Sequence, residues 1–132
     1  LRRLPDLLAA RTHAAQVYAA GLGDLDALTL PVALDDRTHP WQSYVITLDP
    51  ALDRSRVAVA LREQGVGCNF GTYASHVQPV YGVAAERGCP VSADLFDRHL
   101  AIPMHANLTD EDLGHVIDTV RAVVGSATVR RR

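Results

Sequence analysis

The stretch from Leu108 to Gly125 constrains the fold most strongly, because it carries complete signals for one amphipathic helix. Thr109 lies three residues before Asp112, which approximates a capping box, and Leu108 and Leu113 occupy the positions of a hydrophobic staple. The apolar residues that follow at helical spacing are Leu113, Val116, Ile117, Val120 and Val123 or Val124. The sequence therefore predicts a final helix, closed by Gly125, that must bury one apolar face.

A second helical pattern opens the chain, over about residues 4 to 20. The residues on its repeating face are Leu4, Leu7, Leu8, Arg11, Ala14, Ala15, Tyr18 and Leu22. We expect Gly21 and Gly23 to end this helix. The chain begins without methionine and already in this pattern, so we treat Leu1 as the boundary of a fragment cut from something longer.

Short strand-like runs lie between these two helices. Trp41 to Leu48 mixes aromatic and β-branched residues and predicts a strand buried on at least one face. Leu28 to Leu34 contains Pro31, which favours a sheet edge or a loop. Asp35 to Pro40 predicts a polar turn, Val66 to Phe70 an extended segment, and Leu100 to Pro103 a strand that runs into a turn at Met104 to Asn107.

Two further helices separate the strands. Asp53 can cap a helix whose Val57 and Leu61 face the sheet until Gly65 ends it. Val91 to His99 predicts a short helix with Leu95 and Phe96 inward, after a weakly patterned stretch between Tyr81 and Gly88. The fold class is therefore α/β, a small antiparallel or mixed sheet covered by helices, in a single domain over residues 1 to 132.

Composition excludes several functions. Thirteen basic and fifteen acidic residues give a net charge of −2, so the charge does not favour binding to nucleic acid or an anionic membrane. We expect the basic tail Arg130 to Arg132 to be a frayed end rather than an arm. No apolar run approaches the ~20 residues of a membrane span. We expect Cys68 and Cys89 to be free thiols, which indicates a reducing, cytoplasmic setting. All basic residues are arginine, so this chain supplies no lysine for a Schiff base.

Candidate binding groups concentrate between Gly65 and Tyr81. Tyr73, His76 and Gln78 could hydrogen-bond a polar ligand, and His76 could also transfer a proton near neutral pH. The alternative is that Tyr73 and His76 only satisfy backbone groups in a turn. His105, just before the final helix, could approach a ligand from a strand end or be an ordinary surface turn residue.

Other sites have little support. The scattered histidines match no metal-ligand spacing, so we expect no metal site, and His99 and His115 are most simply partly exposed helix residues. Gly65, Gly67 and Gly71 lack the pattern of a phosphate loop and are expected to permit turns. No serine lies in a nucleophile elbow, so hydrolase chemistry is not indicated.

Taken together, ordered stretches across nearly the whole chain resemble the C-terminal domain of the DegT/DnrJ/StrS family. The matching residues are Arg11, Ala15, Tyr18; Trp41, Tyr44, Val45, Ile46; Arg56, Leu61, Gly65, Val66; Tyr73, His76, Gln78, Pro79, Tyr81; Cys89, Pro90, Ala93, Leu100, Ile102, Pro103, His105, Leu108, Thr109, Asp112 and Val116. These are fold type I, pyridoxal-phosphate-dependent aminotransferases that act on nucleotide-linked keto sugars.

The resemblance implies a small domain that packs on a larger cofactor-binding domain and closes one side of the active site, usually within a homodimer. It places Tyr73 and His76 near the substrate as sugar-nucleotide contacts, with Asn69, Thr72 and His105 completing the set. It puts the Schiff-base lysine and most of the pyridoxal phosphate site in an N-terminal domain absent here, so this chain alone holds no catalytic residue. An amino acid would be the amino donor, and the product would enter secondary-metabolite or polysaccharide biosynthesis.

The competing interpretation is a stand-alone, non-catalytic binding or interaction module of the same fold. It predicts polar surfaces throughout, because monomers seldom expose large apolar patches. The aminotransferase interpretation predicts instead an exposed apolar patch on the first helix or on Leu28 to Leu34.

Overall fold

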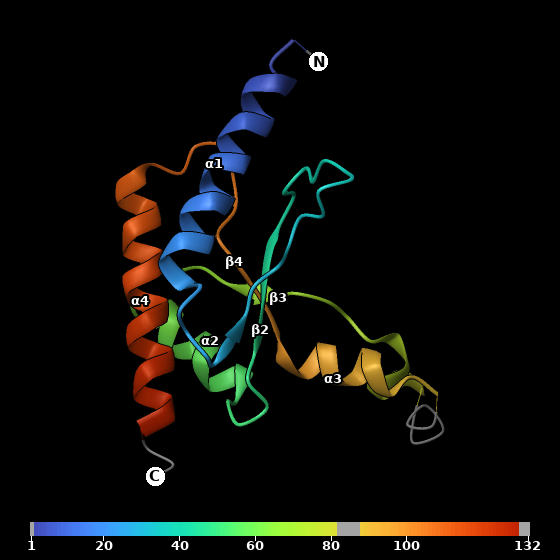
Figure 1. The fold of residues 1–132 in the computed structure, drawn as a ribbon. Coiled ribbons are helices and arrows are strands. Elements are labelled where there is room, and N and C mark those ends of the chain that lie inside the picture. The colour runs from blue at the N-terminus through green and yellow to red at the C-terminus, as the bar shows by residue number, and fades with distance from the viewer. Residues whose placement is uncertain (1, 82–87, 130–132) are drawn as a thin grey trace.

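The computed structural model describes residues 2–81 and 88–129 and shows helices packed on a small sheet (Figure 1). In chain order the elements are α1 (Leu4–Leu22), β1 (Leu28–Thr29), β2 (Tyr44–Leu48), α2 (Arg54–Glu63), β3 (Asn69–Phe70), the 3₁₀ turn η1 (Ser75–Val77), α3 (Pro90–Arg98), β4 (His99–Ile102) and α4 (Asp110–Val129). The expected α/β class is confirmed. Most of the stretch between Tyr81 and Gly88, and the tail Arg130 to Arg132, lie outside the described residues.

The four strands form one antiparallel sheet in the order β1-β2-β4-β3. The central pair is β2 and β4, whose register sets Tyr44 opposite Ile102 and Ile46 opposite Leu100. β1 is a two-residue edge strand, in agreement with the prediction from Pro31. The sheet is thus antiparallel, with no parallel pair among the described residues.

Side-chain alternation gives the central strands a buried face and a half-covered face. The buried residues on the first face, with 0–3% of each exposed, are Tyr44, Ile46, Leu48, Leu100 and Ile102. Each such side chain contributes about 1.5–3 kcal/mol when buried. Val45, Thr47, His99 and Ala101 lie on the other face and are only half-buried. We call this the outward face.

Helices α1, α2 and α4 cover the buried face, while α3 projects on the side away from α4 (Figure 1). Tyr18 of α1 is fully buried and donates its hydroxyl to the Pro103 carbonyl at 2.8 Å. Its ring lies 5.1 Å from that of Tyr44, and burial raises the pKa of both phenols, that of Tyr44 to about 12. These aromatic side chains join α1 to the centre of the sheet.

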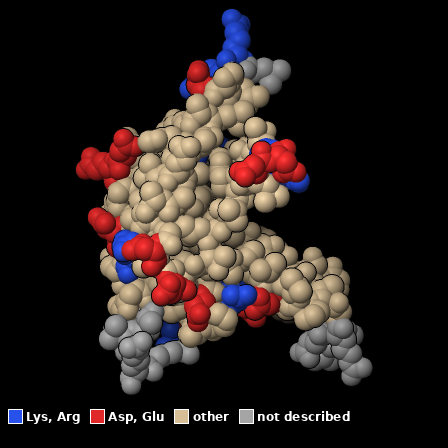
Figure 2. Space-filling view, viewed as in Figure 1, with Lys and Arg blue, Asp and Glu red and all other residues tan. Residues whose placement is uncertain are grey.

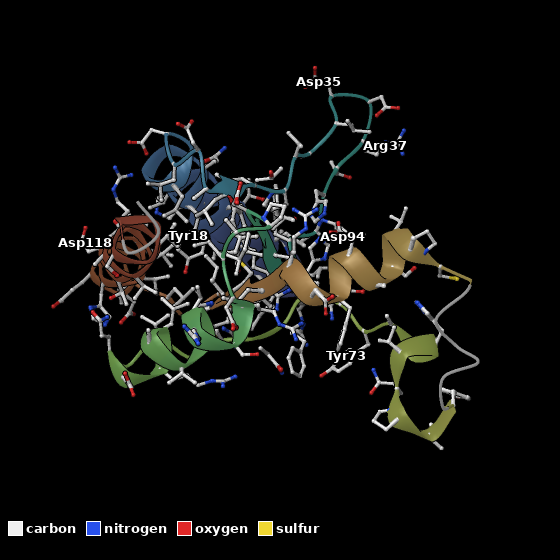
Figure 3. The ribbon with its side chains drawn as sticks, turned by 90° about the horizontal axis from the view of Figure 1, so that it is seen from below. Tyr18, Asp35, Arg37, Tyr73, Asp94 and Asp118 are labelled. Carbon is white, nitrogen blue, oxygen red and sulfur yellow. The ribbon has the colours of Figure 1, made fainter. Side chains whose placement is uncertain are left out.

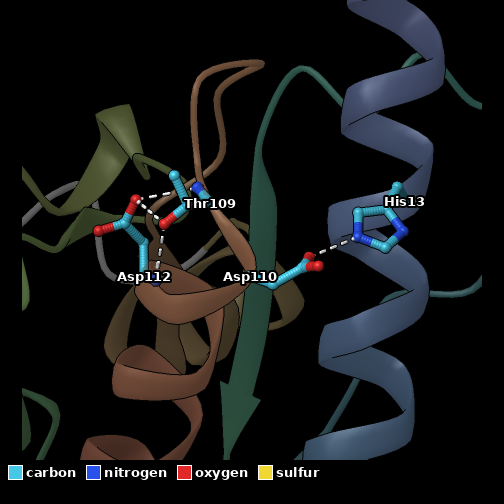
Figure 4. A network of polar contacts seen from close by, with 4 residues as sticks. All are labelled: His13, Thr109, Asp110 and Asp112. Atoms are coloured by element: carbon cyan, nitrogen blue, oxygen red, sulfur yellow. Dashed lines mark hydrogen bonds and ion pairs between the residues drawn. The ribbon is translucent and has the colours of Figure 1, made fainter.

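The start of α4 has the expected capping box (Figure 4). Thr109 Oγ1 accepts from the Asp112 backbone N–H at 3.1 Å, and Asp112 Oδ2 accepts from the Thr109 N–H at 2.9 Å. The hydrogen bonds that the Thr109 backbone N–H and hydroxyl donate to the Asp112 carboxylate hold its pKa below the usual range. Nearby, His13 of α1 contacts Asp110 at 2.7 Å, but both side chains are exposed, so this pair contributes little to stability.

Three local predictions need correction. Gly125 does not close α4, which continues to Val129, because glycine inside a helix costs only about 1 kcal/mol relative to alanine and does not force an end. Gly21 likewise lies within α1, and Gly23 is the C-cap. His99 is a strand residue, since it pairs with Thr47 as soon as α3 ends at Arg98.

The short helices agree better with their sequence signals. The Asp53 carboxylate caps α2 by accepting from the N–H groups of Ser55 and Arg56 at 2.9 and 3.1 Å. Gly65 follows α2 with φ of 81°, a left-handed conformation that favours glycine. On α3, the two side chains predicted to face inward, Leu95 and Phe96, are each half-buried.

An ion pair ties the end of α1 to α4. The Arg121 guanidinium donates to both carboxylate oxygens of Asp24, at 2.5 and 2.8 Å, and to the Gly21 carbonyl at 2.7 Å. These hydrogen bonds lower the pKa of Asp24 to about 2. Because the pKa in the folded state lies below its ordinary value, the stabilisation is present above about pH 4 and is lost as the pH falls towards 2.

We therefore expect Asp24→Asn to lower the thermal unfolding temperature of the chain at pH 6, by an amount that shrinks as the pH falls from 4 to 2. Scanning calorimetry over this pH range measures the effect. The control is Asp26→Asn, because Asp26 is exposed and makes no hydrogen bond or ion pair with the described residues. A pH-independent difference for Asp24→Asn would show that the ion pair does not stabilise the fold.

Candidate functional site

The 69–78 segment, Asn69 to Gln78, contains most of the predicted binding residues. It starts as β3, which pairs with β4 so that Asn69 lies opposite Ala101 and Phe70 opposite Leu100. Beyond the strand, Ala74 is buried, and Gln78 donates its side-chain amide to the Ala74 carbonyl at 3.1 Å. The segment is therefore fixed to an edge of the sheet at one end and folded on itself at the other.

Gly71 brings this segment into close contact with the outward face. A Cβ at position 71 would lie 2.4 Å from Val45 Cγ1 and 2.8 Å from His99 Cβ, closer than real Cβ atoms approach other atoms. The Gly71 N–H also donates to the His99 carbonyl at 3.3 Å. Gly71 is thus required for close approach, whereas the sequence had indicated only a turn.

Tyr73 is held at the surface by other aromatic rings. Its side chain is 65% exposed, and Figure 3 shows it next to α3. The ring lies 5.5 Å from that of Phe70 in an edge-on arrangement and 6.5 Å from that of Phe96. No sequence pattern links Phe96 to this site, because Phe96 and Tyr73 are 23 positions apart and only the fold brings them together.

The structure groups some predicted site residues and separates another. Thr72, Tyr73 and His76 follow Gly71 at the His99 end of β4. His105 follows the opposite end of β4, close enough to Asp112 to help lower the pKa of that carboxyl. Because β4 runs antiparallel to β3, the chain places His105 and Tyr73 beyond opposite ends of the sheet.

Asn69 has a local partner. Its side-chain oxygen accepts a hydrogen bond from the Phe70 backbone N–H at 2.8 Å, and its side chain is otherwise exposed. His76 lies in η1 and is half-buried. The predicted site residues of this segment, Asn69, Thr72, Tyr73 and His76, together offer an amide, two hydroxyls and an imidazole, which can donate hydrogen bonds to a polar ligand or accept them from it.

The described residues contain further titratable side chains outside this segment. Among the described residues, no group of three or more His, Cys, Asp or Glu side chains could hold a metal ion. Cys68 and Cys89 are free, and burial raises the pKa of the Cys68 thiol. Burial also lowers the pKa of His99, with Arg98 adding to the shift. Within the part of the chain described, no helix has the length and apolar character needed to cross a membrane.

The surface has a hollow beside α3 and, elsewhere, an apolar groove beside α1. On the face that it presents, Figure 2 shows scattered charges of both signs and a hollow between α3 and the loop that carries Asp35 and Arg37. Separately, the start of α1 borders a cavity of about 480 Å³, which we call the α1 groove. It is lined by Leu4, Leu7, Leu8, Arg11, Pro40, Gln42, Ala106 and Asn107. The three leucines of this groove are 37–45% exposed.

Comparison with known proteins identifies the family. The model of the DegT/DnrJ/EryC1/StrS aminotransferase family matches residues 1–121. The chain belongs to this family. The resemblance inferred from the sequence is thereby confirmed.

Curated relatives in the family are about three times as long as this chain. The spore coat polysaccharide biosynthesis protein SpsC of Bacillus subtilis (strain 168) is 28% identical over 96% of this chain and 34% of its own length. The dTDP-4-dehydro-2,3,6-trideoxy-D-glucose 4-aminotransferase of Saccharopolyspora spinosa is 29% identical over 94% of this chain and 32% of its own. The chain therefore spans about a third of the length of these relatives.

Solved structures of aminotransferases have the same fold. The aminotransferase TlmJ of Streptoalloteichus hindustanus superimposes with a TM-score of 0.86 at 30% identity, over 96% of this chain and 34% of TlmJ. Helicobacter pylori PseC, an aminotransferase of pseudoaminic acid biosynthesis, also gives 0.86 at 19% identity, over 96% of this chain and 35% of its own. At 19% identity, the similarity to PseC shows only that the two chains share a fold.

The close approach at Gly71 gives a test of how this family member fixes its 69–78 segment. Gly71→Ala should destabilise the chain by about 1–3 kcal/mol, because the new methyl group overlaps Val45 and His99. Gly67→Ala is the matched control, since nothing lies within 4 Å of a Cβ there. Urea unfolding measures both; equal stabilities would exclude tight packing at Gly71.

Proposed function

We propose that this chain is the C-terminal part of a pyridoxal-phosphate-dependent aminotransferase that transfers an amino group to a nucleotide-linked keto sugar. The observation that carries the proposal is the family match over residues 1–121 in a chain that spans a third of its relatives. In this proposal the 69–78 segment forms one wall of the substrate pocket.

The substrate class is supported by the names of the relatives. The S. spinosa relative is named for a dTDP-linked 4-keto sugar, and the B. subtilis relative is named for polysaccharide biosynthesis. Such a substrate presents hydroxyl, carbonyl and phosphate oxygens. Tyr73, Thr72 and His76 can donate hydrogen bonds to these oxygens, and His76 adds positive charge when it is protonated.

The cofactor requires residues that this chain lacks. Pyridoxal phosphate in an aminotransferase is bound covalently by a lysine amine, and all thirteen basic residues here are arginine. The residues present therefore do not by themselves fit the cofactor, and we assign its attachment to the N-terminal domain of the longer protein. We propose that this protein is a cytoplasmic homodimer with an amino acid as donor and that the fragment alone is inactive.

The competing module interpretation predicted polar surfaces throughout. Instead, Val32 and Leu34 are 81% and 56% exposed, and the α1 groove adds three exposed leucines. Exposed apolar surface of this kind favours contact with another protein part. We infer that it packs against the N-terminal domain.

The decisive experiment uses the protein as its source cell makes it. Its intact mass is measured together with its visible absorbance and its turnover of nucleotide-linked keto sugars with an amino donor. A chain far larger than 14.3 kDa, with bound cofactor and sugar-dependent turnover, agrees with the proposal. A colourless native product of this size would support the non-catalytic module.

Within the longer enzyme, His76→Ala should raise the KM for the keto sugar by about 10- to 100-fold, the loss of a hydrogen bond to a charged or strongly polar group. The cofactor absorbance and the KM for the amino donor should stay unchanged. His115→Ala is the control, because His115 lies on α4, outside the 69–78 segment, and makes its hydrogen bond to the Gln64 carbonyl at 3.0 Å. Loss of the cofactor absorbance in His76→Ala would contradict a role in sugar binding.

A further inference from the structure

Arg54, the first residue of α2, contacts two aromatic rings. Its guanidinium carbon lies 4.3 Å from the ring centre of Phe70 and 4.8 Å from that of Phe96. One of its terminal nitrogens also donates to the Phe96 carbonyl. The two rings are 5.8 Å apart, so one cation contacts both at once. We call Arg54, Phe70 and Phe96 the Arg54 clamp.

Several other described arginines pair with a carboxylate, whereas Arg54 contacts aromatic rings. Arg37, Arg56, Arg98 and Arg121 form ion pairs with aspartates. Arg54 makes no ion pair within 4 Å among the residues that the structure describes. A planar guanidinium suits such a position, because it can stack on aromatic faces while its N–H groups donate in the plane.

The clamp joins three elements that are distant in sequence. Arg54 begins α2, Phe70 ends β3, and Phe96 lies in the last turn of α3. The pairing of β3 with β4 is short, because β3 has only two residues and lies at the sheet edge. Backbone pairing alone therefore gives this edge little support, and the clamp adds a side-chain connection to the body of the domain.

The same two rings support Tyr73. The Tyr73 ring packs edge-on against Phe70 at 5.5 Å and lies 6.5 Å from Phe96 at an angle of 37°. With 65% of Tyr73 exposed, these rings are the main constraint on where its hydroxyl points. Any shift of Phe70 or Phe96 would move that hydroxyl.

We propose that Arg54 is a positioning residue, which fixes the Tyr73 hydroxyl and the backbone of the 69–78 segment without touching the substrate. This inference rests on the proposed function for its effect on sugar binding. The contacts of the Arg54 clamp lie within this chain and do not depend on the proposed function. The proposal thus gives Arg54 a role in sugar recognition, which its position at the start of α2 did not indicate.

The test uses the full-length aminotransferase with Arg54→Met, which keeps the length of the side chain but removes the charge and the planar donor. Amide hydrogen exchange should accelerate about 3- to 30-fold over residues 71–77, the factor expected from losing a cation–π contact. The KM for the keto sugar should rise by a similar factor, while the KM for the amino donor and the cofactor absorbance stay unchanged.

Two variants complete the series. Arg56→Met is the matched control, because Arg56 lies two residues further along α2 with an 89% exposed side chain and only a 3.6 Å ion pair to Asp53. Phe96→Leu removes one ring of the clamp and should reproduce the effects of Arg54→Met. Should Arg54→Met fail to fold, Arg54→Lys, which keeps the charge but loses the planar group that stacks on the two rings, carries the same test.

A double-mutant cycle decides whether Arg54 acts through Tyr73. On a Tyr73→Ala background, Arg54→Met should raise the sugar KM no further, since the group that it positions is gone. An equal rise on both backgrounds, or unchanged exchange over residues 71–77, overturns the inference. If the wild-type enzyme turns over no keto sugar, the proposed function fails. The exchange measurement still shows whether Arg54 holds the 69–78 segment in place.

Discussion

The pairing of β2 with β4 is the constraint on which the rest of the structure depends. It sets Tyr44 opposite Ile102 and Ile46 opposite Leu100, so that one face of both strands is apolar and buried. A slip of one residue would move every one of these side chains to the other face, which fixes the register. Helices α1, α2 and α4 then have only one apolar surface to cover, and they all pack on it (Figure 1).

The same pairing decides where binding chemistry can lie. Because the helices occupy one face, the outward face remains open to the close approach of Gly71, and the 69–78 segment continues from there towards α3. The antiparallel direction of β4 carries His105 to the other end of the sheet. The Arg54 clamp adds side-chain support at an edge where the backbone supplies few hydrogen bonds.

Local sequence signals predicted those features that local forces control. The Thr109 capping box, the Asp53 cap and the turn at Gly65 all depend on groups within a few residues, and each forms as expected. The predictions for His99 and Gly125 were wrong for the same general reason. Strand pairing with Thr47 overrides the helical pattern at His99, and nothing compels the helix to stop at a tolerated glycine.

The sequence by itself determined the elements, the α/β class and the family, because apolar periodicity, caps and ordered motif residues are all written along the chain. It also located a polar stretch around Tyr73 and His76. Only the tertiary structure decided which residues stand beside that stretch. Arg54 and Phe96 are 42 positions apart and meet through non-local packing, which no pattern along the chain encodes.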